Sequence, residues 1–512
     1  MNSFHITLRT PPEILGAISS YLTEEDLFSA SQVCQRWRSV LTSSASLWTR
    51  ISYKRGPSGR ATASLERCGF LPIQLRPEPP FQSAILEDVL PHGNKVLSLT
   101  ANHSPSWISQ LQPLFAFSRP SVERLLLYSD DFWGADPEEQ VICEIWQDFP
   151  LLRELLVRSH CVPIGRFTTP NLVHLALEYT DPPHQNVTVQ TILDALRGCP
   201  LLETLLLDYA IPIPSVAAHG HSPVHLPRLR CIEVGSCEVQ SGLITHLDFP
   251  PDVAAGFRLM YPSHLWGQIP DLILYSVQHV LRRIRIRCIT LATCLEREEY
   301  CIRFEGLRGS LEITTVHTPD GRLQIDLLFG PEGVLFSHSP NIENVTEIHV
   351  VGCPFDTGPG LDHVKVAMPN VDTISFFECD APRAFELLTS ENLSLLQFPR
   401  LERVMVLGEE FGLEDMARRR RDLGVPLKTL VIGRDLEGLE YDHTGDYAAL
   451  GELVDDLRVE CPVEILGWGS GNKIIDFWSE AATPSFVSPG ERLITPYLIN
   501  STASFHGIKK QL

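Results

Sequence analysis

PLLETLLL, residues 200–207, is the clearest copy of a short pattern that recurs along much of the chain. Six other copies also begin with proline: PSVERLLL at 120, PLLRELLV at 150, PNLVHLAL at 170, PRLRCIEV at 227, PNVDTISF at 369 and PRLERVMV at 399. The residues two, five and seven positions after the proline are apolar in every copy, although only 44% of the chain is apolar. This alternation predicts a β-strand in each copy with one buried face. We call these seven segments the proline frames.

The spacing of the proline frames predicts a repeat architecture. Successive frames are 30, 20, 30 and 27 residues apart in the first group, and two looser copies begin at Pro340 and Pro426. Such periods with an L-x-x-L-x-L core are typical of leucine-rich repeats. Helices are expected between the strands, at residues 138–147, 187–197, 382–391, 412–421 and 446–460. We therefore predict an arc-shaped α/β solenoid of irregular leucine-rich-repeat-like units over residues 81–478, with an ordinary α/β sheet as the alternative.

Three other segments complete the expected organisation. Residues 311–318 and 322–329, separated by Pro-Asp-Gly, predict a β-hairpin inserted in the repeats near 310–330. Residues 53–80, rich in proline and glycine, are expected to be a linker, and residues 479–512 a C-terminal cap or tail.

The first 52 residues predict a small all-α module of three short helices. Thr10 would cap the first helix with Glu13 closing a capping box, and Thr23 would cap the second, where acidic residues follow. A serine-rich break precedes a short apolar end, Leu47-Trp48. Helices this short bury little core, so the module is expected to pack against the rest of the chain or a partner.

The order of these elements, from PPEIL at 11–15 through VCQRWR at 33–38 to LW at 47–48, resembles an F-box. The resemblance implies binding to a Skp-family adaptor, which joins F-box proteins to a cullin–RING ubiquitin ligase. Thr10 and Ser19 depart from the family, which favours Leu and Phe at these positions. Carried over by position, the residues implied to supply the adaptor contact or its supporting core are Pro11, Pro12, Ile14, Leu15, Ile18, Leu27, Val33, Cys34, Trp37, Leu41, Leu47 and Trp48.

The charge of the chain limits the classes of partner. The formal net charge is −21, and residues 1–52 hold four basic and four acidic groups, so the later residues carry the whole excess. General binding to nucleic acid or to anionic membranes is therefore not expected. No secretory signal or membrane-spanning stretch is apparent, which predicts a cytoplasmic or nuclear protein.

Motifs of enzyme chemistry are not apparent in the sequence. There is no Walker phosphate loop, no G-x-S-x-G elbow and no Cys-x-x-Cys pair among the 13 cysteines. The histidines at 219, 221 and 225 could bind a metal, but a solvated loop is the favoured interpretation. We expect no catalytic residue, no metal and no cofactor.

Two groups of arginines stand out in the acidic background. Arg283, Arg285 and Arg287 alternate with isoleucines, so a strand would present all three guanidinium groups on one face. They are speculative substrate-binding residues for acidic or phosphorylated segments, and neutralisation by nearby carboxylates is the favoured alternative. Residues 418–421 are four consecutive arginines at the end of an expected helix, where solvated charges are the default.

The sequence as a whole predicts the substrate-recognition subunit of an SCF-type ubiquitin ligase. The F-box would bind the adaptor, the repeat region would bind an unknown protein substrate, and the chain would be monomeric apart from the complex. An F-box scaffold outside any ligase is the alternative, and an undetected hydrolase is a remote one.

Overall fold

The structure is a computed structural model of the whole chain. The chain divides into two compact units: residues 1–175 with 479–512, and residues 176–478. Each unit is described by itself. The residues that the structure describes are 10–53, 59–77, 89–102, 114, 118, 121–128, 149–158, 169–178, 189–208, 222–235, 243–259, 277–294, 299–306, 309–316, 342–351, 368–377, 388, 398–407, 412–433 and 447–460.

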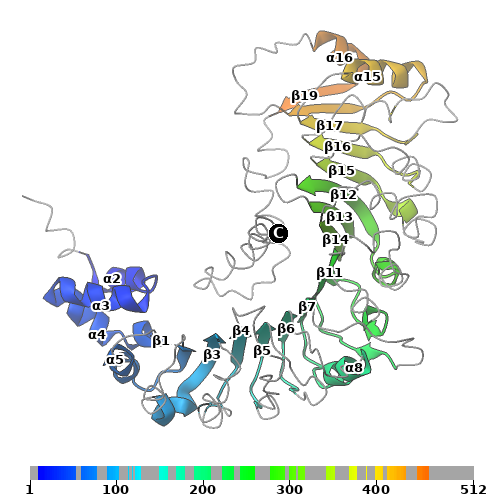
Figure 1. Cartoon of the computed structure of the whole chain (residues 1–512). Helices are drawn as coiled ribbons and strands as arrows, with labels where there is room; N and C mark the ends of the chain where they lie inside the picture. Colours follow the sequence, from blue (N-terminus) through cyan, green and yellow to red (C-terminus); the bar gives the residue numbers. More distant parts are fainter. Residues whose placement is uncertain are drawn as a thin grey trace, which may run out of the picture. The chain divides into compact units, whose positions relative to one another are not determined.

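The first unit begins with the expected helices, shown in Figure 1: α2 (Pro12–Ser19), α3 (Glu24–Val33), α4 (Gln35–Ser43) and the 3-10 turn η2 (Ala45–Trp48). The Thr23 cap is confirmed, since the Asp26 amide donates to the Thr23 hydroxyl over 3.2 Å. The Thr10 cap is wrong. Pro11 is the N-cap of α2 and makes no side-chain cap hydrogen bond, because the helix begins one residue later than expected, at Pro12.

The helices of the first unit lead into parallel strands. They are β1 (Arg50–Tyr53), β2 (Ile73–Pro77), β3 (Val96–Asn102), β4 (Arg124–Tyr128) and β5 (Glu154–Arg158), and each pairs in parallel with the next. The 3-10 turn η3 (Leu90–Lys95) precedes β3.

Residues 53–80 differ from the expected linker. They contain the helix α5 (Gly59–Cys68) and the strand β2, which pairs with β1 on one side and β3 on the other. The helix buries Leu65 and Cys68, and Ile73 and Leu75 of β2 are buried as well. These four residues thus belong to a packed core, although the ends of the segment have a turn-forming composition.

Every proline frame forms a strand that begins four residues after its proline. The seven strands are β4 and β5, described above, and β6 (His174–Glu178), β7 (Thr204–Asp208), β9 (Cys231–Gly235), β16 (Thr373–Phe377) and β17 (Arg403–Leu407). In all seven frames the second, fifth and seventh residues after the proline are buried, with exposed fractions of 5% or less. The looser copies also form strands, β15 (Glu347–Val351) and β18 (Thr429–Gly433).

Backbone hydrogen bonds explain why the frames begin with proline. In six frames the amide two residues after the proline donates to the carbonyl before it, over 3.0–3.5 Å, so the proline occupies the second position of a turn, where its fixed φ is favoured. Equivalent positions then pair in parallel register, as Thr204 with Cys231 and Thr373 with Arg403. One frame therefore places its buried residues directly beside those of the next.

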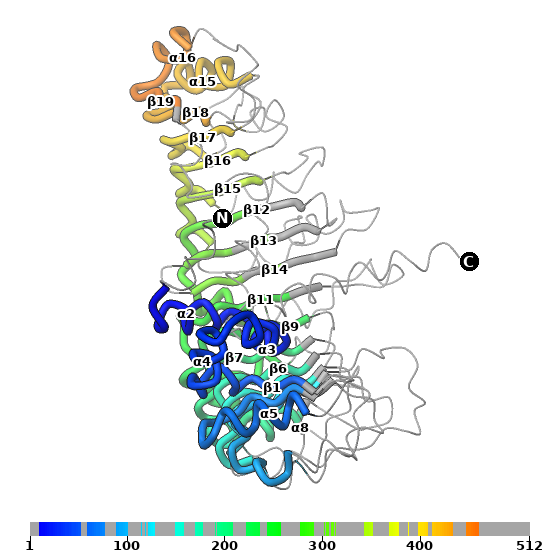
Figure 2. Tube along the Cα trace, turned by 90° about the vertical axis from the view of Figure 1, so that its left-hand side faces the viewer, coloured from blue at the N-terminus to red at the C-terminus, as the bar shows by residue number. Residues whose placement is uncertain are grey.

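The second unit contains a mostly parallel sheet, whose strands lie side by side in Figure 2. The pairings run from β7 through β9, β11 (Ala254–Leu259), β14 (Ser310–Val316), β13 (Glu299–Gly306), β12 (Ile286–Cys294), β15, β16, β17 and β18 to β19 (Asp456–Glu460). Only β13 among these strands is antiparallel to its neighbours. A separate pair of short strands is formed by β8 (Val224–His225) and β10 (Leu247–Asp248), and the 3-10 turn η7 (Ile342–Asn344) precedes β15.

Only the first half of the hairpin predicted near 310–330 is described. Its first half is indeed a strand, β14, but β13 occupies one edge of β14 and β11 occupies the other. The second half of the predicted hairpin, residues 322–329, lies outside the described residues. The described antiparallel insertion is built from β12, β13 and β14.

Two of the expected helices are confirmed, as α8 (Val189–Arg197) and α15 (Leu413–Asp422). The helix expected at 446–460 is shorter, because α16 (Ala448–Leu453) ends before β19, whose parallel pairing with β18 determines the conformation of residues 456–460. Residues 138–147 lie outside the described residues, and only Leu388 is described from the helix expected at 382–391. The linear sequence did not separate a helix from the strand that follows it.

Candidate functional site: the N-terminal helical domain

Part of the predicted adaptor-binding set is exposed to solvent. Ile14 and Ile18, one helical turn apart on α2, are 51% and 49% exposed, and Val33 at the end of α3 is 70% exposed. Tyr21, which the sequence analysis did not include, is 86% exposed. Pro11, Pro12, Ile14, Ile18, Tyr21 and Val33 are hereafter the exposed apolar set. Large apolar side chains gathered at the surface of so small a domain are typical of an interaction surface.

A second part of the predicted set is buried within the domain. Leu15, Leu27, Leu41 and Trp48 have exposed fractions of 4% or less. The Trp48 indole N–H donates to the Leu41 carbonyl over 2.8 Å, so its polar atom is satisfied internally. These four residues hold the helices together, and the structure places them in the core that supports the exposed apolar set.

The remaining three members, Cys34, Trp37 and Leu47, are half-buried. Within the described part of the chain, the buried Nε1 atom of Trp37 has no hydrogen-bond acceptor. An indole N–H usually finds a partner when it is buried. Trp37 therefore lies between the core and the surface, and its indole N–H is a hydrogen-bond donor without an acceptor among the described residues.

The two positions that depart from the family pattern make local hydrogen bonds. Ser19 is fully buried, and its hydroxyl donates to the Leu15 carbonyl over 2.6 Å, one turn earlier in α2. The Thr10 carbonyl accepts a hydrogen bond of 2.6 Å from the Arg36 guanidinium of α4. The Thr10 contact ties the start of α2 to α4 through the main chain, independently of the side chain at this position. The Ser19 contact lies within α2 and satisfies the buried hydroxyl.

The helices rest on the elements that follow them. Glu24, in the first turn of α3, accepts hydrogen bonds from the Ser52 amide of β1 at 2.8 Å and from the Ser64 hydroxyl of α5 at 2.7 Å. Burial raises the pKa of Glu24 above its ordinary value of 4.5, and these two hydrogen bonds oppose that shift. The carboxylate of Glu24 therefore links three elements.

Aromatic packing reinforces this link. The rings of Phe28 and Trp48 meet edge to face at 5.0 Å, and the Arg67 guanidinium of α5 lies 4.3 Å from the centroid of the Trp48 ring. The sequence-based expectation that the helices lean on another part of the chain is confirmed, and α5 with β1 is that part.

Comparison with known proteins agrees with the helices and the strand just described. Residues 9–54 match the F-box-like family. The chain therefore contains an F-box-like domain, which covers α2 to β1. No curated protein matches the chain.

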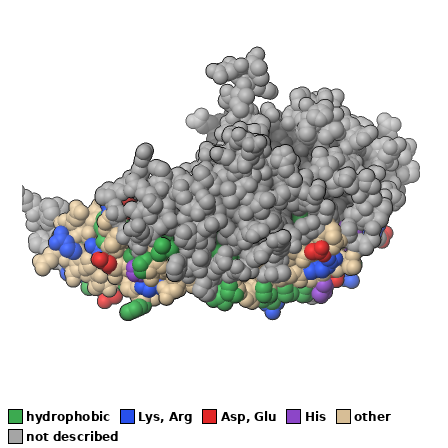
Figure 3. Space-filling view, turned by 60° about the horizontal axis from the view of Figure 1, so that its bottom comes forward, with side chains coloured by type: hydrophobic (Ala, Val, Ile, Leu, Met, Phe, Trp, Pro, Cys, Tyr) green, Lys and Arg blue, Asp and Glu red, His purple; other side chains and the backbone are tan. Residues whose placement is uncertain are grey.

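The three arginines proposed for substrate binding do not form one uniform row. Arg283 precedes β12 and binds Asp248 at 3.1 Å and the Phe249 carbonyl at 2.6 Å. Arg287 lies on β12 and binds Glu347 at 2.6 Å. Arg285 is exposed and also lies before the strand. Carboxylates thus occupy two of the three guanidinium groups, as the alternative interpretation expected. On the face shown in Figure 3, described basic and acidic side chains are likewise interspersed.

The second arginine group contains a buried member that the sequence did not reveal. On α15, Arg418 pairs with Glu414, whereas Arg420 is fully buried and donates to the carbonyls of Phe398 and Leu401 at 3.2 and 3.3 Å. Burial lowers the pKa of Arg420 to about 10. Arg420 anchors α15 to the turn that begins the last proline frame, so it is not part of a solvated cationic cluster.

The histidine-rich stretch forms no described metal cluster. Histidines 219 and 221 lie outside the described residues, and His225 Nδ1 lies 2.8 Å from the carboxylate of Asp248. A different group, Cys288, Glu347 and His349, brings three potential ligand atoms together. Sequence analysis missed it because the cysteine is about sixty residues from the other two, and only the pairing of β12 with β15 makes them neighbours. None of the helices among the described residues has the length and apolar character that a membrane crossing requires.

Proposed function

We propose that this chain is the substrate-recognition subunit of an SCF-type ubiquitin ligase. The observation that carries the proposal is the F-box-like match at residues 9–54, together with the exposed apolar set on the same helices. F-box domains generally bind Skp-family adaptors. The adaptor would in turn connect the chain to a cullin and its RING subunit.

The exposed apolar set supports adaptor binding by its chemistry. On adaptor binding, Ile14, Ile18 and Val33 would bury the apolar surface that now faces water. Because Ile14 and Ile18 are already half-buried, each would contribute roughly half of the about 1.5–3 kcal/mol gained by burying a fully exposed side chain. The half-buried Trp37 adds an aromatic anchor of the type that dominates interface energies. An interface of this kind would use the exposed set and leave the core residues untouched.

We also propose that the proline frames are irregular leucine-rich-repeat-like units that bind a protein substrate. Their equivalent positions pair in register, and one carbonyl per unit, such as that of Glu203, accepts two amides of the next strand at 2.8 and 3.1 Å. Repeat surfaces of this type commonly bind proteins. The acidic excess beyond residue 52 favours basic or neutral partners.

In this proposal the chain has no catalytic residue of its own. It would accelerate ubiquitin transfer by holding the substrate near the ligase, which raises the effective concentration of the reacting groups. Such a subunit would act in the cytoplasm or the nucleus, as a monomer apart from the complex.

Co-purification of the full chain with the ligase subunits tests the proposal. The chain, tagged at its C-terminus, should recover both a Skp-family adaptor and a cullin from cells. The double variant Ile14→Asp, Ile18→Asp should recover neither, because it places charge on an exposed apolar surface without disturbing the core. Phe70→Asp is the matched control, since Phe70 is 96% exposed and lies beyond α5.

The same experiment separates the scaffold alternative. Recovery of the adaptor without any cullin would favour a scaffold outside the ligase. Equal recovery of the adaptor by the double variant and the unsubstituted chain would exclude the proposed interface. The Thr10 carbonyl still ties the start of α2 to α4, and the buried Ser19 hydroxyl is satisfied, so we expect adaptor binding to survive both departures.

A further inference from the structure

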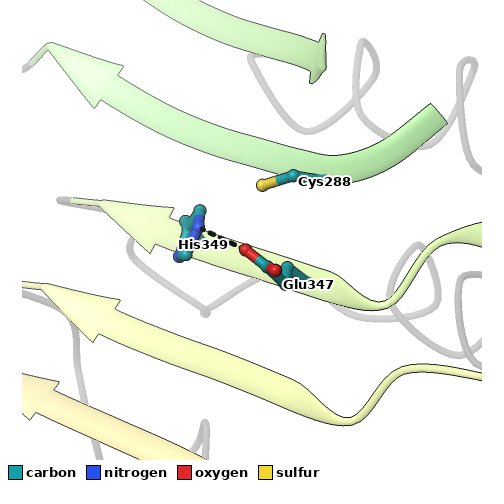
Figure 4. Close-up of side chains that lie close together, drawn as sticks. All are labelled: Cys288, Glu347 and His349. Carbon is teal, nitrogen blue, oxygen red and sulfur yellow. Dashed lines mark ion pairs between the residues drawn. The ribbon is translucent and has the colours of Figure 1, made fainter. Parts of the chain in front are cut away.

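Cys288 and Glu347 lie directly opposite each other on the neighbouring parallel strands β12 and β15, and His349 is two residues further along β15. Their side chains lie on the same face of the sheet, as Figure 4 shows. The cysteine sulfur, a carboxylate oxygen and an imidazole nitrogen all lie within 4.8 Å of one another. Three different ligand-forming groups therefore converge on one point.

The contacts of these groups leave ligand atoms facing one another. One carboxylate oxygen of Glu347 binds Arg287 at 2.6 Å, and the other lies 3.9 Å from His349 Nε2, too far for a hydrogen bond. The His349 Nδ1 atom is buried and has no hydrogen-bond partner among the described residues. A buried nitrogen without a partner costs stability, so the internal contacts of the fold do not account for this histidine.

The surrounding charge favours a cation. Glu305 of β13 lies opposite Cys288 on its other side, and both Glu305 and Glu347 act electrostatically on Cys288 and on His349. Two carboxylates therefore border the cluster, and Arg287 pairs with one of them, Glu347.

We propose that Cys288, Glu347 and His349 bind one divalent transition-metal ion, Zn²⁺, which joins β12 to β15. Sulfur, imidazole and carboxylate are the ligands that zinc takes in proteins, at about 2.0–2.3 Å. Tetrahedral geometry at these bond lengths places ligand atoms about 3.3–3.8 Å apart. Closing separations of up to 4.8 Å to these values takes side-chain movements of about 1 Å. The fourth position would be held by water, and Glu305, opposite Cys288 on β13, would accept its hydrogen bond.

The proposed ion would have a structural role. β12 pairs with β13 of the antiparallel insertion on one side and with β15 of the parallel sheet on the other, and the cluster lies at this junction. An ion there would fasten the insertion to the strands that follow it. This inference is independent of the F-box-like domain, so adaptor binding and metal binding can fail separately.

Cobalt titration of the purified full chain tests the site. The protein is freed of metal with a chelator, kept reduced and titrated with Co²⁺, whose thiolate charge-transfer and tetrahedral d–d bands report the ligands. The unsubstituted chain should show these bands, and Zn²⁺ should abolish them by displacement. Cys288→Ala should bind one equivalent less and lose the thiolate band that belongs to this site.

Cys231→Ala is the matched control. Cys231 lies on β9, has a thiol pKa raised to about 12 by burial, and belongs to no ligand cluster among the described residues. This variant should bind Co²⁺ like the unsubstituted chain. Should Cys288→Ala fold poorly, Glu347→Gln and His349→Gln preserve side-chain volume, and each should weaken binding at least tenfold, as should Glu305→Gln through the bound water.

Two outcomes would overturn the inference. One is an unsubstituted chain that shows no thiolate–cobalt band at all. The other is a Cys288→Ala chain with the same stoichiometry and spectrum as the unsubstituted protein, which would place the bound cobalt on other cysteines.

Discussion

Leu151 and Leu152 are adjacent leucines in one proline frame, and they should respond very differently to truncation. Leu152 occupies the second position after Pro150 and is fully buried, whereas Leu151 is 47% exposed. Leu152→Ala should destabilise β5 and its neighbour β4 by about 2–5 kcal/mol, the cost of removing a core leucine. Leu151→Ala should cost less than about 1 kcal/mol, since only half of its side chain is removed from water.

Hydrogen exchange measured by mass spectrometry on peptides that cover β4 and β5 is the suitable assay, because local stability is read without assuming two-state unfolding of a large chain. At about 1.4 kcal/mol per tenfold change, Leu152→Ala should accelerate exchange by about 30- to 4,000-fold. Leu151→Ala should accelerate it by less than about fivefold. Equal acceleration by the two variants, or a larger effect at Leu151, would refute the assignment of the buried face.

Three further predictions concern side chains that the sequence did not explain. Arg420→Ala should lower the stability of the C-terminal strands by several kcal/mol, because it leaves the Phe398 and Leu401 carbonyls without their donor. In the same exchange assay, Arg419→Ala should change the stability by less than about 0.5 kcal/mol, because Arg419 is exposed. Ser19→Phe introduces the residue that is usual in the family. It should destabilise the F-box-like domain by about 1–3 kcal/mol or more, because Ser19 has no exposed surface and the larger ring would not fit. Thermal unfolding measures this, and an unchanged unfolding midpoint would show that the site can expand. Because the folded-state pKa of Glu24 is raised, its contribution to stability is present at low pH and is lost as the pH rises above 4.5. Glu24→Gln should remove this part of the pH dependence of stability, and an identical pH profile for both proteins would contradict it.

The strands were largely predictable because one local pattern encodes them. A proline that starts a turn and apolar residues at fixed offsets specify both the start of each strand and its buried face, as Leu205 and Leu207 of β7 illustrate. Pairing partners were less predictable. Residues 311–316 were correctly predicted to form a strand. Their partner β13, however, comes earlier in the chain, whereas the turn-forming residues that follow them favoured pairing with residues 322–329.

The candidate site was predictable in composition and less so in exposure. The motif identified Ile14 and Leu15 together, yet only the packing of α2 on α4 shows that the first faces solvent and the second the core. The burial of Arg420 and the convergence of Cys288 with His349 depend on contacts between distant segments. No local pattern in the sequence carries that information.

The central claim is that the exposed apolar set of the F-box-like domain binds a Skp-family adaptor. Isothermal titration of the purified adaptor into the purified full chain measures this directly. We predict that the unsubstituted chain and Phe70→Asp bind with the same Kd, and that Ile14→Asp weakens binding by at least about 30-fold, the effect of losing one interface hot spot. An unsubstituted chain that does not bind the adaptor, or an Ile14→Asp chain that binds it equally well, would contradict the claim.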